Sequence, residues 1–307
     1  MNLKSCLFLA FFYAAFAAKA QSNVGFSKKK ANNVEIEAYG DYRSSDFQWS
    51  IAGNNLGQNP NILSEVKWKN IKGPGMGLDI RLNIWSPIFF KGSYHRTWIK
   101  SGQVTDNDYA ADNRTEPGYH ADLNSNEGFI YTWFVTTGYE FRIGQTLKIS
   151  PYAGYTKNTQ QLHLKNFNNE TDPAIKTLNS IYQANRAGLI LGAAATLSLT
   201  NQLSVEGIVN YSQVKYQAYA DWNLIDAFAH PVSFKHKANG YGTEALLQLN
   251  YSFTAVLSVL IRGNYDYTNT GKGTDELFLV DGRQLQSQFN GATGSDSGFG
   301  IGVSLKL

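Results

Sequence analysis

The feature that most constrains this chain is an alternation of apolar and polar residues with a period of two, sustained over long segments. From residue 129 to 143, aromatic or aliphatic side chains fill nearly every second position, and Thr, Gly, Glu and Arg fill most of the positions between them. The same alternation runs through residues 78–84 and 257–266. Because successive side chains of a β-strand point to opposite faces, each segment predicts a strand with one apolar face and one polar face.

The lengths of the strands and of their connections narrow the fold class. The predicted strands are about 15 to 20 residues long, whereas strands of soluble proteins average five or six. Short turns fall at Ser86-Pro87, Gly144-Gln145, Asn201-Gln202 and Ser252 to Thr254. Long polar connections cover roughly residues 50–62, 103–125, 167–182, 222–233 and 270–293. Five long and four short connections make ten strands.

This pattern predicts an all-β fold: a closed ten-stranded antiparallel transmembrane β-barrel of the outer membrane, with short periplasmic turns and long extracellular loops. The alternating segment 299–307 is the expected closing strand. A barrel of ten strands encloses a lumen that side chains largely fill, so a general diffusion pore is not expected.

The first twenty residues have the pattern of a secretory signal peptide. Lys4 precedes an apolar run over residues 7–18, and Ala18-Lys19-Ala20 is a small-x-small cleavage site. We therefore predict a signal peptide over residues 1–20 and the barrel over residues 21–307.

Removal of that segment changes the chemistry available to the chain. The only cysteine, Cys6, lies within it, so the mature chain has no disulfides and no thiolate sites, which suits passage through an oxidising periplasm. The mature chain keeps 25 basic against 24 acidic residues once Lys4 and Lys19 are removed, and this balance implies no nucleic-acid partner.

The strongest candidate for chemistry is the acidic pair in Asp106-Asn107-Asp108, which we expect at the external end of the third strand. Residues two apart on a strand share a face, so both carboxylates point the same way and crowd one another. Such a pair can share a proton or position a water molecule. An Asp-x-Asp sequence is also common in solvated loops, and that interpretation stays open.

A second polar group lies at the external end of the seventh strand, in Asp221-Trp222-Asn223. In a ten-stranded barrel the third and seventh strands stand across the lumen from each other. The apolar positions of the seventh strand change parity near residue 213, which predicts a β-bulge there. With that bulge, Asp221 and Asn223 turn toward the lumen and face the acidic pair.

These residues resemble the omptins, a family of outer-membrane endopeptidases on a ten-stranded barrel, and the resemblance covers most of the mature chain. The segment 104–109 is similar to the omptin segment that carries the catalytic Asp pair. Further similarities keep the family's order along the chain: Asp46 and Val66-Lys67-Trp68-Lys69 upstream, then Thr115-Glu116, His120, Asp122 to Asn124, and Ala153-Gly154-Tyr155 downstream.

The resemblance implies a mechanism in which the acidic pair faces an Asp-x-His dyad and a water held between them attacks the peptide carbonyl. The positions that align with the dyad are Asp221 and Asn223. This is a departure from the family, because asparagine cannot accept a proton at neutral pH. His230 is the alternative general base if the loop carries an insertion, and His236 is a second alternative.

The resemblance also implies substrate-binding residues. Asp46 falls where omptins carry a specificity acid, and Glu116 belongs to the acidic stretch that follows the Asp pair. Tyr219 takes the place of the acid that selects basic side chains, which puts specificity for Arg or Lys in doubt.

The implied partners are peptide or protein substrates at the cell surface, outer-membrane lipid and lipopolysaccharide. Lys67, Lys69 and Lys100 are candidate contacts for lipopolysaccharide, although lysines at strand ends also anchor barrels in the interface. No cofactor is expected apart from lipopolysaccharide. The histidines are scattered and predict no metal site.

Three hypotheses about function follow. The first is an omptin-type endopeptidase, which uses Asp106, Asp108 and Asp221 to hydrolyse peptides or proteins at the cell surface. The second, motivated by Asn223, is a non-proteolytic surface-binding protein or adhesin with the omptin fold. The third is a narrow channel of unrelated ancestry, which gives no reason for the acidic pair to face Asp221.

Overall fold

The computed structural model describes residues 34–166 and 177–307 of the chain. The predicted signal peptide lies outside the described residues, as does part of the connection predicted at 167–182. Among the described residues there is no helix with the length and hydropathy needed to cross a membrane.

The described residues form antiparallel β-strands and one short helical turn. They are β1 (Val34–Ile51), β2 (Ser64–Trp85), β3 (Ile88–Trp98), β4 (Ser101–Ala111), η1 (Asp112–Arg114), β5 (Thr115–Asn124), β6 (Gly128–Tyr139), β7 (Phe141–Ile143), β8 (Leu147–Lys165), β9 (Asn179–Ser198), β10 (Leu203–Asp221), β11 (Phe234–Ser252), β12 (Leu257–Thr270), β13 (Gly273–Phe278) and β14 (Gln284–Lys306).

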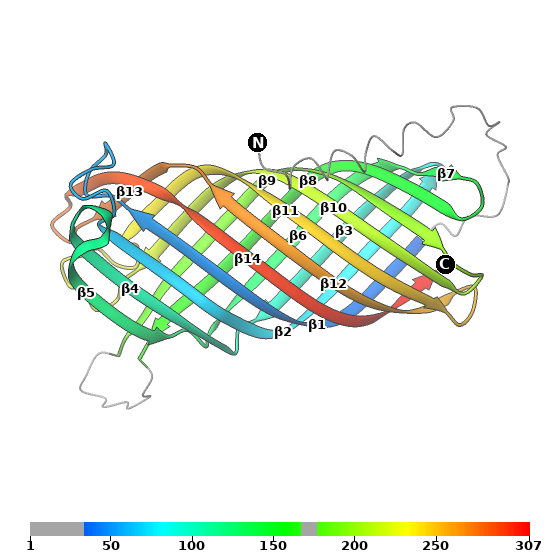
Figure 1. The fold of residues 1–307 in the computed structure, drawn as a ribbon, viewed down its shortest axis with the longest axis horizontal. Coiled ribbons are helices and arrows are strands. Elements are labelled where there is room, and N and C mark those ends of the chain that lie inside the picture. The colour runs from blue at the N-terminus through cyan, green and yellow to red at the C-terminus, as the bar shows by residue number, and fades with distance from the viewer. Residues whose placement is uncertain (1–33, 167–176) are drawn as a thin grey trace. The chain divides into compact units, whose positions relative to one another are not determined.

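These strands form one closed barrel, because β1 pairs with β14 on one side and with β2 on the other (Figure 1). Several long strands are interrupted. β3 and β4 make the third barrel strand, β5, β6 and β7 make the fourth, and β12 and β13 make the ninth. The prediction of a closed ten-stranded antiparallel barrel is confirmed.

The connections agree with the sequence at the short turns and differ at two of the long connections. Each predicted short turn separates two paired strands. Residues 103–125 and 270–293, predicted as long polar loops, instead lie largely in the hairpins β4–β5 and β13–β14. The prediction was wrong there because polar residues predominate in both hairpins. Their few inward apolar side chains, such as Val104 and Phe289, are too sparse to give a recognisable alternation, and backbone pairing holds the strands.

The outer wall carries a band of exposed apolar side chains. Leu189 and Leu191 on β9 and Phe299 and Ile301 on β14 are among the most exposed of them. Tyrosines in contact with one another mark the limit of the band toward the long-loop end: Tyr94 with Tyr131, Tyr211 with Tyr241, and Tyr241 with Tyr267. Such a band, limited by aromatic rings, is the surface that a membrane barrel presents to lipid.

The expected β-bulge in the seventh strand does not exist. β10 pairs without a register shift with both β9 and β11 from Ser204 to Ala220. Even-numbered residues such as Val214 and Tyr216 are buried along its outer half, and odd-numbered residues such as Lys215 are exposed. The two faces are continuous and only their polarity changes, because the strand leaves the apolar band after Tyr211.

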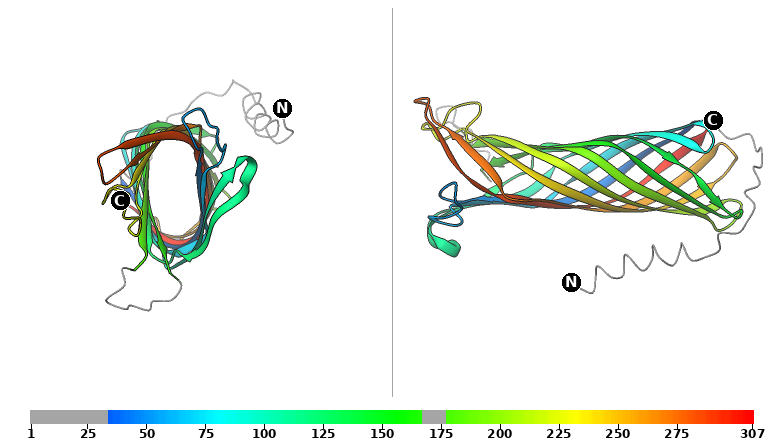
Figure 2. Two further views of the ribbon diagram at one scale, coloured as in Figure 1. Left: turned by 90° about the vertical axis from the view of Figure 1, so that its left-hand side faces the viewer. Right: turned by 90° about the horizontal axis from the view of Figure 1, so that it is seen from above.

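The lumen is closed at the long-loop end by aromatic side chains. The ring of Tyr182 on β9 lies 5.9 Å from Phe47, 5.6 Å from Trp49 and 5.5 Å from Trp68. β9 is the fifth strand from β1 in either direction, so these rings bridge opposite walls of an oval barrel (Figure 2). We call this cluster the aromatic plug; its buried rings are Phe47, Trp49, Trp68, Tyr182, Tyr216, Phe234 and Phe289.

Candidate functional site

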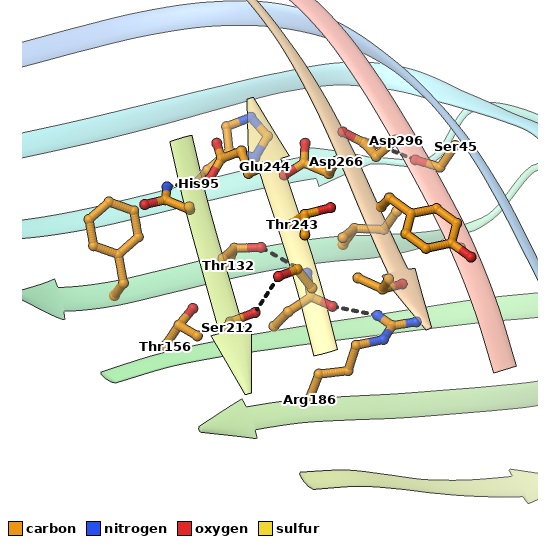
Figure 3. Close-up of a pocket in the computed structure, with 18 of the residues that line it drawn as sticks. Ser45, His95, Thr132, Thr156, Arg186, Ser212, Thr243, Glu244, Asp266 and Asp296 are labelled. Atoms are coloured by element: carbon orange, nitrogen blue, oxygen red, sulfur yellow. Dashed lines mark hydrogen bonds between the residues drawn. The ribbon is translucent and has the colours of Figure 1, made fainter. Parts of the chain in front are cut away.

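Two places inside the barrel gather polar side chains: a cavity below the aromatic plug and the rim above it. The cavity has a volume of about 190 Å³ and is lined from several strands (Figure 3). On one wall Arg43 pairs with Asp41 at 2.9 Å and with Asp296 at 2.7 Å, and the hydroxyl of Ser45 donates to Asp296. The charges on this wall are therefore paired with one another.

The opposite wall of the cavity carries Arg186. Its Nη1 donates to Asn158 Oδ1 at 2.7 Å and to Gln160 Oε1 at 3.1 Å, and its guanidinium lies 5.2 Å from the ring of Phe47. The hydrogen bonds of Arg43 and Arg186 thus join neighbouring strands, and the contact of Arg186 with Phe47 reaches the opposite wall. Such side chains are the usual filling of a narrow barrel.

The rim contains the acidic pair. Asp106 and Asp108 lie on β4 and share the face that carries buried Val104, and Asp106 is itself buried. Burial, and to a lesser extent the neighbouring Asp108, raises the pKa of Asp106 to about 7, although a hydrogen bond from Trp222 lowers it. Burial likewise raises the pKa of Asp108, opposed by Ser64. Near neutral pH this pair can therefore hold a proton.

Trp222 was not singled out by the sequence, and it is the side chain that reaches Asp106 from the seventh strand. It follows β10 with the same parity as buried Ala218 and Ala220, so it points inward. Its ring packs 4.8 Å from Phe234 and 6.4 Å from Trp49. Without the expected bulge, the even-numbered Trp222 faces the third strand, in place of Asp221 and Asn223.

Asp221 points to the outer face of β10, so the expectation that it turns toward the lumen was wrong. It lies opposite Ile181 of β9, and both alternate with fully buried residues, Ala220 and Tyr182. Its Oδ1 is 2.6 Å from His230 Nδ1. The structure therefore brings the predicted alternative base to Asp221, on the opposite face from the acidic pair.

Asn223 is engaged in the framework of the rim and does not turn to the lumen as expected. Its Oδ1 accepts hydrogen bonds from the backbone N–H of Asn179 at 3.0 Å and from Ser180 Oγ at 3.1 Å. Its Nδ2 donates to the carbonyl of Thr177 at 2.9 Å. These bonds tie the end of β10 to the beginning of β9.

His236, the second alternative base, is buried inside the aromatic plug. Its Nδ1 is 2.8 Å from the hydroxyl of Tyr182, which in turn lies 2.6 Å from the hydroxyl of Tyr216. Its Nε2 is 3.2 Å from Asp275. Burial lowers the pKa of His236, partly offset by Asp275. Sequence reasoning gave no indication of this buried chain of polar groups, because its members come from distant strands.

The three predicted substrate-binding residues lie in different places. Asp46 is on the outer face of β1 and accepts a bond from the N–H of Asn70 at 2.8 Å. Tyr219 is on the outer face of β10, and its hydroxyl donates to Gln183 at 3.0 Å. Glu116 is exposed near the start of β5. The structure does not bring these three residues together around the acidic pair.

Comparison with known proteins places this barrel in a family. A family model described as Pom, Protochlamydia outer membrane protein, matches residues 38–307. The chain belongs to the Pom family. It is therefore an outer-membrane barrel, and the long-loop end is extracellular. No curated protein matches the chain.

Among solved structures, the Pom-family chain is similar to the outer membrane protease OmpT from Escherichia coli. The two share 11% identity with a TM-score of 0.74, over 93% of this chain and 100% of that chain. The predicted omptin resemblance is thus confirmed for the fold. The translocator domain of NalP from Neisseria meningitidis has 10% identity and a TM-score of 0.40, over 99% of this chain and 98% of its own. A FadL homologue of Pseudomonas aeruginosa has 10% identity and a TM-score of 0.31, over 89% and 90%.

The rim can offer carboxylates and hydrogen-bond donors to a ligand from outside the cell. Within residues 34–166 and 177–307, no group of three or more His, Cys, Asp or Glu side chains is arranged to hold a metal ion. The arrangement is an acidic pair covered by an indole, on the inner face of a hairpin that projects outward.

Proposed function

We propose that this Pom-family chain is a non-proteolytic outer-membrane barrel that binds peptide or protein ligands at its extracellular rim. The observation that carries the proposal is the indole of Trp222 against Asp106. The omptin-type mechanism needs, besides the acidic pair, a second base across the lumen within hydrogen-bond reach of the attacking water. An indole N–H only donates, so Trp222 cannot take the place of that second base.

The chain has five histidines, and each is engaged away from the acidic pair. Their partners are Asp41 for His95, Asn107 and Asp122 for His120, Asn179 for His163, Asp221 for His230, and Tyr182 for His236. His120 is the nearest in sequence, but it bonds Asn107, whose parity on β4 is opposite to that of Asp106. The omptin-type endopeptidase therefore has less support than surface binding.

Lipopolysaccharide stays a predicted partner. Of the candidate lysines, Lys69 and Lys100 are exposed on the outer side of the barrel wall. Lys67 is 2.5 Å from Glu65, so its charge is already paired. Lys69 and Lys100 are accordingly the better candidates for contact with lipid phosphate.

The test is a cleavage assay on a mixed peptide library by the refolded barrel in the presence of lipopolysaccharide. We expect no cleavage from the parent chain, from Asp106→Ala or from His230→Ala. Asn223→His should also be inactive, because the side chain at that position bonds to β9. Trp222→His is the variant in which a gain of cleavage is possible, because it puts an imidazole against Asp106. Cleavage by the parent that is lost in Asp106→Ala would contradict the proposal and support the endopeptidase.

A further inference from the structure

Among the described residues, the hairpin β4–β5 has one strand edge without a partner strand at the extracellular end. β5 pairs with β4 along most of its length, through Val104↔Leu123, Asp106↔Ala121 and Asp108↔Tyr119 among others. With β8 it has a single pair, at its last residue, Asn124↔Lys165. In the part of the chain that the structure describes, no strand pairs with the opposite edge of residues 115–123.

The direction of the backbone groups on this edge follows from the pairing. The N–H of Ser125 donates to the carbonyl of Gly102 at 3.0 Å, so residue 125 faces the β4 side. In an antiparallel ladder the residues that bond one neighbour alternate with those that bond the other. Residues 119, 121 and 123 therefore face β4, and the N–H and C=O groups of His120 and Asp122 point to the open edge.

The other side of the hairpin is held firmly. Arg114 forms hydrogen bonds with both carboxylate oxygens of Glu65 on β2, the shortest at 2.6 Å. The side chain of Asn61 exchanges bonds with Asn113, and its N–H donates to Asp112 at 2.7 Å. A strand fixed on one side loses little conformational freedom when a new strand adds to the other, which favours binding.

The charges around the open edge are acidic. Asp122 and Glu116 on β5 are exposed. The basic side chain beside the last residue of this edge, Lys165, is paired with Glu127 at 2.7 Å. Pairing two copies of β5 edge to edge would bring these carboxylates against one another, which disfavours a second copy of this chain. A basic partner is complementary.

We propose that the open edge of β5 binds an extended peptide segment rich in basic residues, which adds to the hairpin as a further strand. The inference rests on the proposed surface-binding function and identifies its ligand class. Backbone bonds with His120 and Asp122 supply affinity independent of sequence, and carboxylates supply the preference for Lys and Arg. Pro117 has no N–H and limits pairing at the start of β5, so the contact is short.

The test is fluorescence anisotropy of a labelled peptide of alternating Lys and Thr residues with the refolded full chain in detergent. Matched peptides replace Lys with Glu, or carry N-methyl groups on two adjacent central residues, which block both edges of the peptide. We expect binding to weaken at least tenfold for the Glu peptide and for the N-methylated peptide.

Two variants test the edge itself. His120→Pro removes an N–H that points away from β4, so the hairpin keeps its internal pairing while the edge loses a donor. His120→Ala removes the same imidazole and keeps the N–H. We expect at least a tenfold loss in His120→Pro and less than a threefold change in His120→Ala, with the heat-modified electrophoretic mobility of a folded barrel in both.

The outcomes separate the inference from the proposed function. If the N-methylated peptide and the His120→Pro variant bind as tightly as the parent pair, strand addition is overturned and the proposed surface binding is left intact. Failure of the Lys peptide to bind, or self-association of the chain through β5, would also overturn it. Cleavage of the peptide would instead overturn the proposed function.

Discussion

The membrane half and the extracellular half of this barrel have opposite polarity. In the membrane half, the outer face carries residues such as Leu191, and the lumen carries paired charges such as Arg43 and Asp296. In the extracellular half, the lumen carries the aromatic plug, and the outer face carries residues such as Lys215 and Gln183. Strands β8 to β11 run through both halves without a change of register.

The difference shows that the solvent outside decides which face is apolar. In lipid the outer face must be apolar, and the narrow lumen keeps the polar groups bonded to one another. Above the membrane the outer face meets water, so the hydrophobic effect moves apolar rings into the lumen. The extracellular half is thus built like a soluble β-barrel on top of a membrane barrel, and its plug bridges opposite walls.

The largest effect is expected from the plug. Tyr182→Ala should lower the free energy of unfolding by about 3–5 kcal/mol, because it removes a fully buried ring and leaves the hydroxyl of Tyr216 and His236 without that partner. The measurement is urea unfolding followed by tryptophan fluorescence. The neighbouring outer residue gives the control, Gln183→Ala, which should change little. Equal losses in the two variants would mean that the plug is not a packed core.

A second effect is expected on the outer wall. Leu191→Arg on β9 puts a charge in the lipid-facing band and should lower the free energy of unfolding by about 2–4 kcal/mol. Gln217→Arg on the adjacent β10 lies above the band, and there the cost should fall to about 0–1 kcal/mol. Refolding into lipid vesicles over a urea series measures both. A similar cost for both variants would place the limit of the membrane band above Tyr211.

The same polarity change explains which parts of the fold could be predicted from the sequence. Alternation, strand length and the short turns were sufficient for the ten-stranded barrel. They failed in β10, where apolar residues move to the other face after residue 213. If the whole strand is assumed to face lipid, a bulge is the simplest interpretation of that change. They also failed at 103–125 and 270–293, where mostly polar segments resemble loops but form hairpins above the membrane.

The candidate site was predictable only in part. The shared face of Asp106 and Asp108 followed from their spacing on a strand, since that depends on local geometry alone. The identity of the inward residue across the lumen could not be predicted in this way, because it depends on which residues face inward at the end of β10. One wrongly predicted bulge reverses that assignment. Trp222 therefore went unnoticed between Asp221 and Asn223. The pairing of His230 with Asp221 depends on how the loop folds back, and no pattern in the sequence determines it.

The smallest expected effect is on the pH dependence of stability, which distinguishes the buried Asp106 of the rim from exposed acids. The pKa of Asp106 is raised to about 7 in the folded barrel, against about 3.9 in an unfolded chain. As pH rises from about 4 to about 7, the unfolded chain ionises while the folded barrel keeps its proton, so stability falls and then stays constant above that range.

Asp106→Asn should therefore be more stable than the parent at pH 8, by about 1–2 kcal/mol once solvent screening at the rim is allowed for, and the gain should vanish near pH 4. Thermal melts of the two chains at pH 4, 6 and 8 measure it, with Asp122→Asn on the same hairpin as the exposed control. A gain that is equal at every pH would show that Asp106 ionises as freely in the barrel as in the unfolded chain, and that Trp222 and the plug leave the acidic pair open to water.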